Sequence, residues 1–111
     1  MPNTNIRLSE KTQSVLKTLC SNYRGDMRIK ATFRCSVHYG LQRFVDEISR
    51  ALRQLKRAKY IQNFYISAEE IDEETDLAFF DVSADLSMSV EEMAEVSVNS
   101  QTVFIQRTGT L

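Results

Sequence analysis

The most regular pattern in the chain is an alternation of apolar and polar residues across residues 27–37, MRIKATFRCSV. The apolar positions are Met27, Ile29, Ala31, Phe33, Cys35 and Val37, and the polar positions are Arg28, Lys30, Thr32, Arg34 and Ser36. A period of two places successive side chains on opposite faces of a strand. The pattern therefore predicts a strand that is buried on one face and open to solvent on the other.

Two other segments repeat their apolar residues with the period of a helix. In residues 40–60 the apolar stripe consists of Leu41, Phe44, Val45, Ile48, Leu52 and Leu55. In residues 9–23 it consists of Val15, Leu16, Leu19 and Tyr23, with Ser9 as the N-cap and Gly25 as the stop. Spacings of three and four residues place each stripe on one helix face. Both segments are predicted to be amphipathic helices.

The later part of the chain predicts two strands, a short helix and a final strand. The strands span residues 62–69 and 76–86, because apolar residues alternate with polar ones there. Ser89 and Glu92 fit a capping box for a helix over 90–98, and Met88 with Met93 fits the accompanying hydrophobic staple. The last strand is predicted over residues 102–108.

From residue 27 onward this order is β-α-β-β-α-β, which is typical of the ferredoxin-like arrangement. We therefore expect an α+β protein with one antiparallel sheet and both helices on one face. The length of 111 residues indicates a single domain over residues 1–111. Residues 1–26 are expected to form an N-terminal helical extension, and residues 27–111 the βαββαβ core. In that arrangement the first and third strands are adjacent and central, so their oppositely charged outward residues face each other.

Charge is distributed unevenly along the chain, although the net charge is only −1. Residues 1–60 hold 13 of the 14 basic residues and four acidic ones, a balance of +9. Residues 61–111 hold one basic residue and 11 acidic ones, a balance of −10. Such asymmetry indicates a charged partner, a charged self-contact or neutralisation within the fold.

Two sets of residues are candidates for contact with a partner. The acidic segment, residues 69–76, has the carboxylates Glu69, Glu70, Asp72, Glu73, Glu74 and Asp76 and no basic residue. The basic cluster, at the end of the helix predicted over 40–60, consists of Arg50, Arg53, Lys56, Arg57 and Lys59. Each set also has a structural interpretation, as a solvated loop and as a solvated helix face with charges that complement the helix dipole.

The residues needed for catalysis or metal binding are scarce. The chain has a single histidine, His38, and no glycine-rich phosphate loop, nucleophile elbow or HExxH motif. A calcium loop starting at Asp72 would require Gly and Glu where Leu77 and Ser83 stand. Cys35 and His38 are spaced as zinc ligands, but no second pair follows. We expect no enzymatic activity, no metal and no cofactor.

These observations favour a small non-enzymatic binding protein that acts through charged surfaces. In the preferred hypothesis the acidic segment mimics phosphates and occupies a basic groove of a nucleic-acid-handling protein. Small inhibitors encoded by phages and mobile elements, including anti-CRISPR proteins, are similar in size and charge. The alternative hypothesis is a nucleic-acid-binding protein that uses the basic cluster.

A homodimer formed through the oppositely charged halves is compatible with either hypothesis. Two unpaired cysteines, a polar N-terminus and the lack of a long apolar run predict a cytoplasmic protein that does not contact a membrane.

Overall fold

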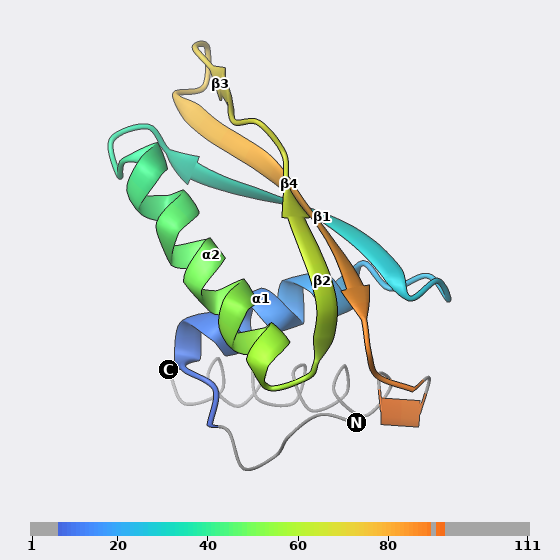
Figure 1. Cartoon of the computed structure of the whole chain (residues 1–111). Helices are drawn as coiled ribbons and strands as arrows, with labels where there is room; N and C mark the ends of the chain where they lie inside the picture. The colour runs from blue at the N-terminus through green and yellow to red at the C-terminus, as the bar shows by residue number, and fades with distance from the viewer. Residues whose placement is uncertain (1–6, 90, 93–111) are drawn as a thin grey trace, which may run out of the picture.

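The computed structural model describes residues 7–89 and 91–92, which form an α+β fold with a single open antiparallel sheet (Figure 1). The elements in chain order are α1 (Glu10–Ser21), β1 (Arg28–Ser36), α2 (Leu41–Arg57), β2 (Ile61–Ile66), β3 (Glu70–Asp72) and β4 (Leu77–Leu86). The first strand, both helices and the strand predicted over 76–86 are confirmed to within a few residues. Helix α1 ends at Ser21, earlier than predicted, and Gly25 lies in the following turn at φ 98°.

The strand order is β1-β4-β2, and β3 also pairs with β4. Both β1 and β2 run antiparallel to β4, so they are parallel to each other, and α2 connects them. The adjacency of the first and third predicted strands is therefore confirmed. A complete ferredoxin-like order is not confirmed, because the helix and strand predicted over 90–98 and 102–108 lie outside the described residues.

The prediction of one strand over 62–69 is wrong at its C-terminal end. The strand β2 ends at Ile66, residues 67–69 belong to no strand, and a separate strand, β3, follows. Between them the Ser67 side chain replaces the regular ladder: its Oγ accepts a hydrogen bond from the Asp81 N–H at 2.9 Å. The Ser67 N–H donates to the Asp81 carbonyl at 2.9 Å. The register then shifts by one residue, since Ile66 pairs with Val82 but Glu70 pairs with Phe79. This break has the character of a β-bulge.

One face of the sheet and the two helices enclose a single core. Leu52 and Leu55 of α2 and Leu19 of α1 are fully buried, and Phe80 of β4 is 1% exposed. The Phe80 ring packs on Phe33 and Phe44, with centroids 6.0 and 5.6 Å away. Burying each large apolar side chain stabilises the fold by about 1.5–3 kcal/mol. This core fixes the outward face of α2, which presents the basic cluster.

The ends of the helices are capped in two different ways. At α1, the Ser9 Oγ accepts a hydrogen bond from the Thr12 N–H at 3.2 Å, which confirms the predicted N-cap. At the end of α2, the Tyr60 N–H donates to Leu55 O and the Lys59 N–H donates to Lys56 O. These bonds make a Schellman motif, with Lys59 at φ 65° in the position that glycine usually occupies.

The start of the last predicted helix is described only at its first residues. The Glu92 N–H donates to the Ser89 Oγ at 3.1 Å, which is one of the two hydrogen bonds of the predicted capping box, and Met88 is 2% exposed. Its proposed staple partner, Met93, lies outside the described residues.

Candidate functional site

Part of the charge asymmetry is cancelled on the open face of the sheet. Arg28 pairs with Asp85 across β1 and β4, with its Nε 2.8 Å from Oδ1, and Lys30 lies 3.5 Å from Asp81. The Thr32 hydroxyl also donates to Asp81 at 2.6 Å. The pKa of Asp85 is lowered chiefly by the hydrogen bond from Arg28, and that of Asp81 chiefly by the one from Thr32. The facing of opposite charges on these two strands is confirmed.

A second neutralised region lies around Glu47, in the first half of α2. Its carboxylate accepts a hydrogen bond from the Tyr39 hydroxyl at 2.6 Å. Lys11 and Arg43 pair with it at 3.9 and 3.4 Å. The hydrogen bond from Tyr39 is the main cause that lowers the pKa of Glu47, and it raises the pKa of Tyr39 in turn. This network ties α1, the turn after β1 and α2 together.

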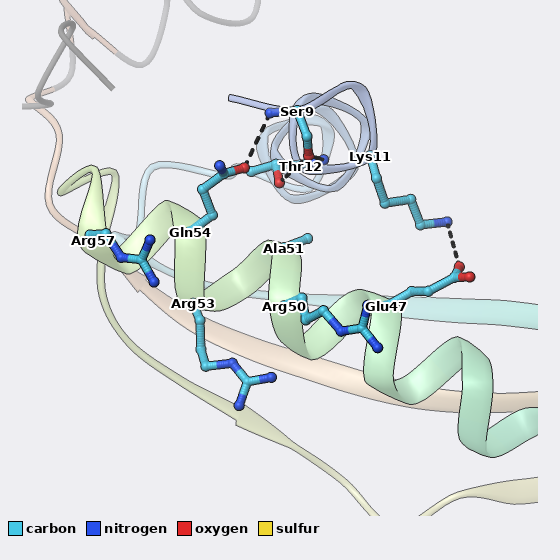
Figure 2. A pocket seen from close by; sticks show the side chains of 9 residues that line it. All are labelled: Ser9, Lys11, Thr12, Glu47, Arg50, Ala51, Arg53, Gln54 and Arg57. Atoms are coloured by element: carbon cyan, nitrogen blue, oxygen red, sulfur yellow. Dashed lines mark hydrogen bonds and ion pairs between the residues drawn. The ribbon is translucent and has the colours of Figure 1, made fainter. Parts of the chain in front are cut away.

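The basic cluster lies beyond that network, on the second half of α2 and the turn after it, and all five of its residues are exposed. Arg50, Arg53 and Arg57 follow one another at intervals of three and four residues, so they share one side of the helix. With Lys11, Ser9 and Gln54 they line a shallow groove between α1 and α2. Figure 2 shows these arginines along α2 and Lys11 reaching across from α1 to Glu47.

The groove walls are held in place by a contact between the two helices. The Ser9 N–H donates to the Gln54 side-chain oxygen at 3.1 Å, and Ala51 on the groove floor is 3% exposed. Within residues 7–89 and 91–92, no acidic residue forms an ion pair with the basic cluster. Glu47 also lines the groove and pairs with Lys11, so the positive charge left without an ion pair among the described residues is that of Arg50, Arg53 and Arg57.

The acidic segment forms most of a hairpin that connects β3 to β4. A four-residue turn follows β3 directly, and it contains no glycine, proline or asparagine. Asp72 supports this turn by accepting a hydrogen bond from the Glu74 N–H at 3.0 Å, and Asp76 takes φ 55°. Asp is one of the few residues that tolerate this left-handed conformation, which is how the hairpin forms without glycine.

All six carboxylates of the acidic segment are exposed, and none forms an ion pair with another described residue. The hairpin projects beyond the N-terminal end of α2, whereas the basic cluster lies toward the opposite end of the molecule (Figure 1). The hairpin is joined to the turn after β1 by a hydrogen bond from the Val37 N–H to the Asp76 carbonyl at 3.0 Å. The two charged surfaces therefore do not neutralise each other within the described part of the chain.

Sequence reasoning missed three features of these surfaces. Lys11 joins the groove from α1, which no local pattern indicates, because it depends on how the helices pack. Ile71 lies within the acidic segment and is 60% exposed. Tyr65, on β2, is 70% exposed. Alternation along residues 62–69 would place Tyr65 on the solvent face, but it gives no indication of how far the ring protrudes.

The arrangement of the cysteine, histidine and carboxylate side chains bears on metal binding. No three or more His, Cys, Asp or Glu residues in the described ranges are grouped so that they could hold a metal ion. Cys20 and Cys35 are free thiols, and burial raises the pKa of Cys20 to about 11. His38 is exposed on the turn before α2. No helix in the described ranges is long and apolar enough to span a membrane.

Comparison with protein-family models gave no match, and comparisons with curated proteins and with solved structures gave no significant match either.

Proposed function

We propose that this chain is a small non-enzymatic binding protein whose acidic segment engages a basic groove on a macromolecular partner. The observation that carries the proposal is the projecting hairpin, on which six exposed carboxylates have no ion pair among the described residues. Like charges so close together repel one another, and a basic partner would relieve that repulsion. The exposed Ile71 among them offers an apolar contact at the centre of the same surface.

The partner class that fits this surface best is a nucleic-acid-handling protein. The basic groove of such a partner binds a row of phosphates, and a row of carboxylates presents a similar charge. Occupation of the groove would exclude the nucleic acid, so the chain would act as an inhibitor. Inhibitors encoded by phages or mobile elements, such as anti-CRISPR proteins, are the kind of protein this describes, and the cytoplasm is where such a partner resides.

The test is capture from a cell lysate with the wild-type chain and with a variant carrying Glu69→Lys, Glu70→Lys, Glu73→Lys and Glu74→Lys. Asp72 and Asp76 stay unchanged, because they support the turn. We expect the wild type to retain nucleic-acid-binding proteins that the variant does not retain, and a short DNA duplex to release them.

A smaller matched pair controls for net charge. Glu73→Lys with Glu74→Lys changes the charge by the same amount as Asp46→Lys with Glu91→Lys, which lie outside the segment. If both pairs and the four-residue variant retain the same proteins as the wild type, the acidic segment is not the binding element.

The second candidate function is nucleic-acid binding through the groove between α1 and α2. The observation that favours it is the set of three arginines, Arg50, Arg53 and Arg57, along one side of α2, which form no ion pair with another described residue. Clustered Arg and Lys residues bind phosphates and release counterions, so the affinity would fall steeply with added salt. Fluorescence anisotropy with labelled single- and double-stranded probes at low salt measures this directly.

In that case Arg53→Ala with Arg57→Ala should weaken binding to all sequences alike. Arg24→Ala with Arg34→Ala removes the same charge from exposed positions outside the groove and should have little effect. The acidic-segment variant separates the two functions, since it loses a protein partner but binds nucleic acid more tightly. If the anisotropy of neither probe changes as protein is added, the chain does not bind nucleic acid and this second function is wrong.

We also propose that the chain forms a homodimer whose stability depends on the attraction between oppositely charged regions of two copies. Added salt screens such attraction, so the dimer should dissociate as ionic strength rises. The mass in solution at low and at high salt measures this, and an unchanged monomer at both would contradict it.

A further inference from the structure

Strand β2 is an outer strand of the sheet in the part of the chain that the structure describes. The Ser67 N–H donates to the Asp81 carbonyl, which makes these two residues a hydrogen-bonded pair. Hydrogen-bonded and non-hydrogen-bonded pairs alternate along an antiparallel ladder. The pairs Ile66–Val82 and Phe64–Ala84 are therefore of the second kind. The backbone N–H and C=O groups of Phe64 and Ile66 consequently point away from β4, toward the open edge.

This edge has little of the protection that exposed strands usually carry. Outer strands are commonly blunted by Lys, Pro or inward-pointing charges. Residues 61–68, IQNFYISA, contain no charged residue and no proline. In the described residues, the register irregularity between Ile61 and Asn63 and the break at Ser67 are the protective features of this edge. By contrast β1, the outer strand on the other side of the described sheet, carries Arg28, Lys30 and Arg34.

Charge on either side of β2 selects the partner that this edge can accept. Lys56 and Lys59 precede the strand, and Glu69 and Glu70 follow it after Ser67 and Ala68. When two copies of β2 pair antiparallel, the first end of each strand lies beside the last end of the other. Basic residues of one copy then meet acidic residues of its partner, twice per dimer. A parallel pairing would instead place like charges together.

We propose that two copies of this chain pair through the outer edges of β2, antiparallel and about a two-fold axis near Phe64. In this register Lys59 of one copy lies opposite Glu69 of the other. The sheet continues across the interface, with main-chain hydrogen bonds supplying affinity and the flanking charges supplying orientation. The two-fold contact is isologous and closes at two copies. The inference rests on the salt-dependent self-association proposed above and names its interface.

Sedimentation equilibrium of the full chain at about 0.02 M and about 1 M salt provides the first test, because the Debye length falls severalfold over this range. We expect a monomer–dimer equilibrium at low salt that shifts toward monomer at high salt. A mass that grows beyond two copies contradicts a closed pair, and so does a monomer under both conditions. Neither result affects capture of an outside partner, which is measured separately.

Tyr65→Lys tests whether the β2 edge is the interface. The exposed Tyr65 lies one residue from the proposed axis, so two introduced lysines would come close together. We expect the dimer dissociation constant to rise about tenfold or more at low salt. Ser14→Lys adds the same charge to the exposed face of α1 and should leave it unchanged. Equal dissociation constants for the two variants would mean that a dimer, if present, uses another surface.

Charge exchange tests the antiparallel orientation. The variant Lys56→Glu with Lys59→Glu places acid beside acid, and Glu69→Lys with Glu70→Lys places base beside base. Each variant should weaken the dimer, and the protein carrying all four changes should recover most of the wild-type affinity. Recovery requires that these residues face one another across the interface. Additive weakening in the four-residue variant overturns the proposed arrangement, provided that circular dichroism shows a native fold.

Discussion

The acidic segment and the basic cluster carry similar amounts of charge, but the fold supports them in different ways. The basic cluster stands on α2, whose inner face is anchored by the fully buried Leu52 and Leu55. The acidic segment stands on a hairpin, and the one apolar side chain within residues 69–76, Ile71, is 60% exposed. The positive surface is therefore fixed in shape by the core, whereas the negative surface is held mainly by backbone hydrogen bonds and the Asp72 turn.

The comparison also shows which charges the fold leaves uncompensated. Acidic and basic residues in the middle of the molecule pair, as Arg28 with Asp85 and Lys11 with Glu47 do. Those at the two ends have no described partner. Each end moreover has a charged residue in a left-handed conformation where glycine would be unstrained, Lys59 at φ 65° and Asp76 at φ 55°. Strain of this kind is often retained at functional positions.

Substitution at the support of each surface should give the largest difference between them. Leu52→Ala opens a cavity beneath the basic cluster and should lower the free energy of unfolding by about 2–5 kcal/mol. Ile71→Ala in the acidic segment should change it by no more than about 0.5 kcal/mol. Urea denaturation followed by circular dichroism measures both. A loss above about 1 kcal/mol for Ile71→Ala would mean that the hairpin packs against the body of the protein.

Acid should destabilise the paired middle of the molecule. The pKa values of Glu47, Asp81 and Asp85 are lowered in the folded chain. Their stabilising effect is fully present above the unfolded pKa values, roughly pH 4, and is lost as the pH falls through the lower folded values. The melting temperature should fall over that interval. Asp85→Asn should make the fall shallower, and an identical pH profile would show that the Arg28 pair does not contribute.

Relieving the strained backbone should stabilise the chain slightly at the basic end. Lys59→Gly places glycine at the Schellman position and should raise the free energy of unfolding by about 0.5–1 kcal/mol. Asp76→Gly should gain less, because Asp already tolerates the left-handed region. Thermal unfolding of the two variants side by side measures the difference. A destabilised Lys59→Gly would indicate that the lysine side chain makes a contact that outweighs the strain.

Charge reversal of the acidic segment should have the smallest effect on stability. The variant with Glu69, Glu70, Glu73 and Glu74 changed to Lys should melt within a few degrees of the wild type, or slightly higher, since no basic residue in the described ranges forms an ion pair with the segment. A clearly lower melting temperature would mean that the segment packs against Arg50, Arg53 or Arg57 in solution.

The sequence predicted most of the elements, because their apolar periods coincide with burial. Residues 27–37 alternate, and β1 is buried in the same alternation up to Phe33. The break at Ser67 could not be predicted, since it depends on where the Ser67 hydroxyl meets the Asp81 N–H of another strand. The candidate residues were visible as charge clusters, but not their separation. Only nine residues lie between Lys59 and Glu69, yet β2 spans roughly 20 Å of that path and carries the acidic segment away.

That separation makes the molecule an electric dipole with almost no net charge. Helix α2 alone is 17 residues, roughly 25 Å, and the acidic segment lies beyond its far end. The Debye length in physiological salt is about 8 Å, so an approaching molecule interacts with one end at a time. At low salt the dipole would turn the protein before contact, so that a basic surface meets the hairpin first. The association rate should therefore depend on ionic strength much more steeply than a net charge of −1 would suggest.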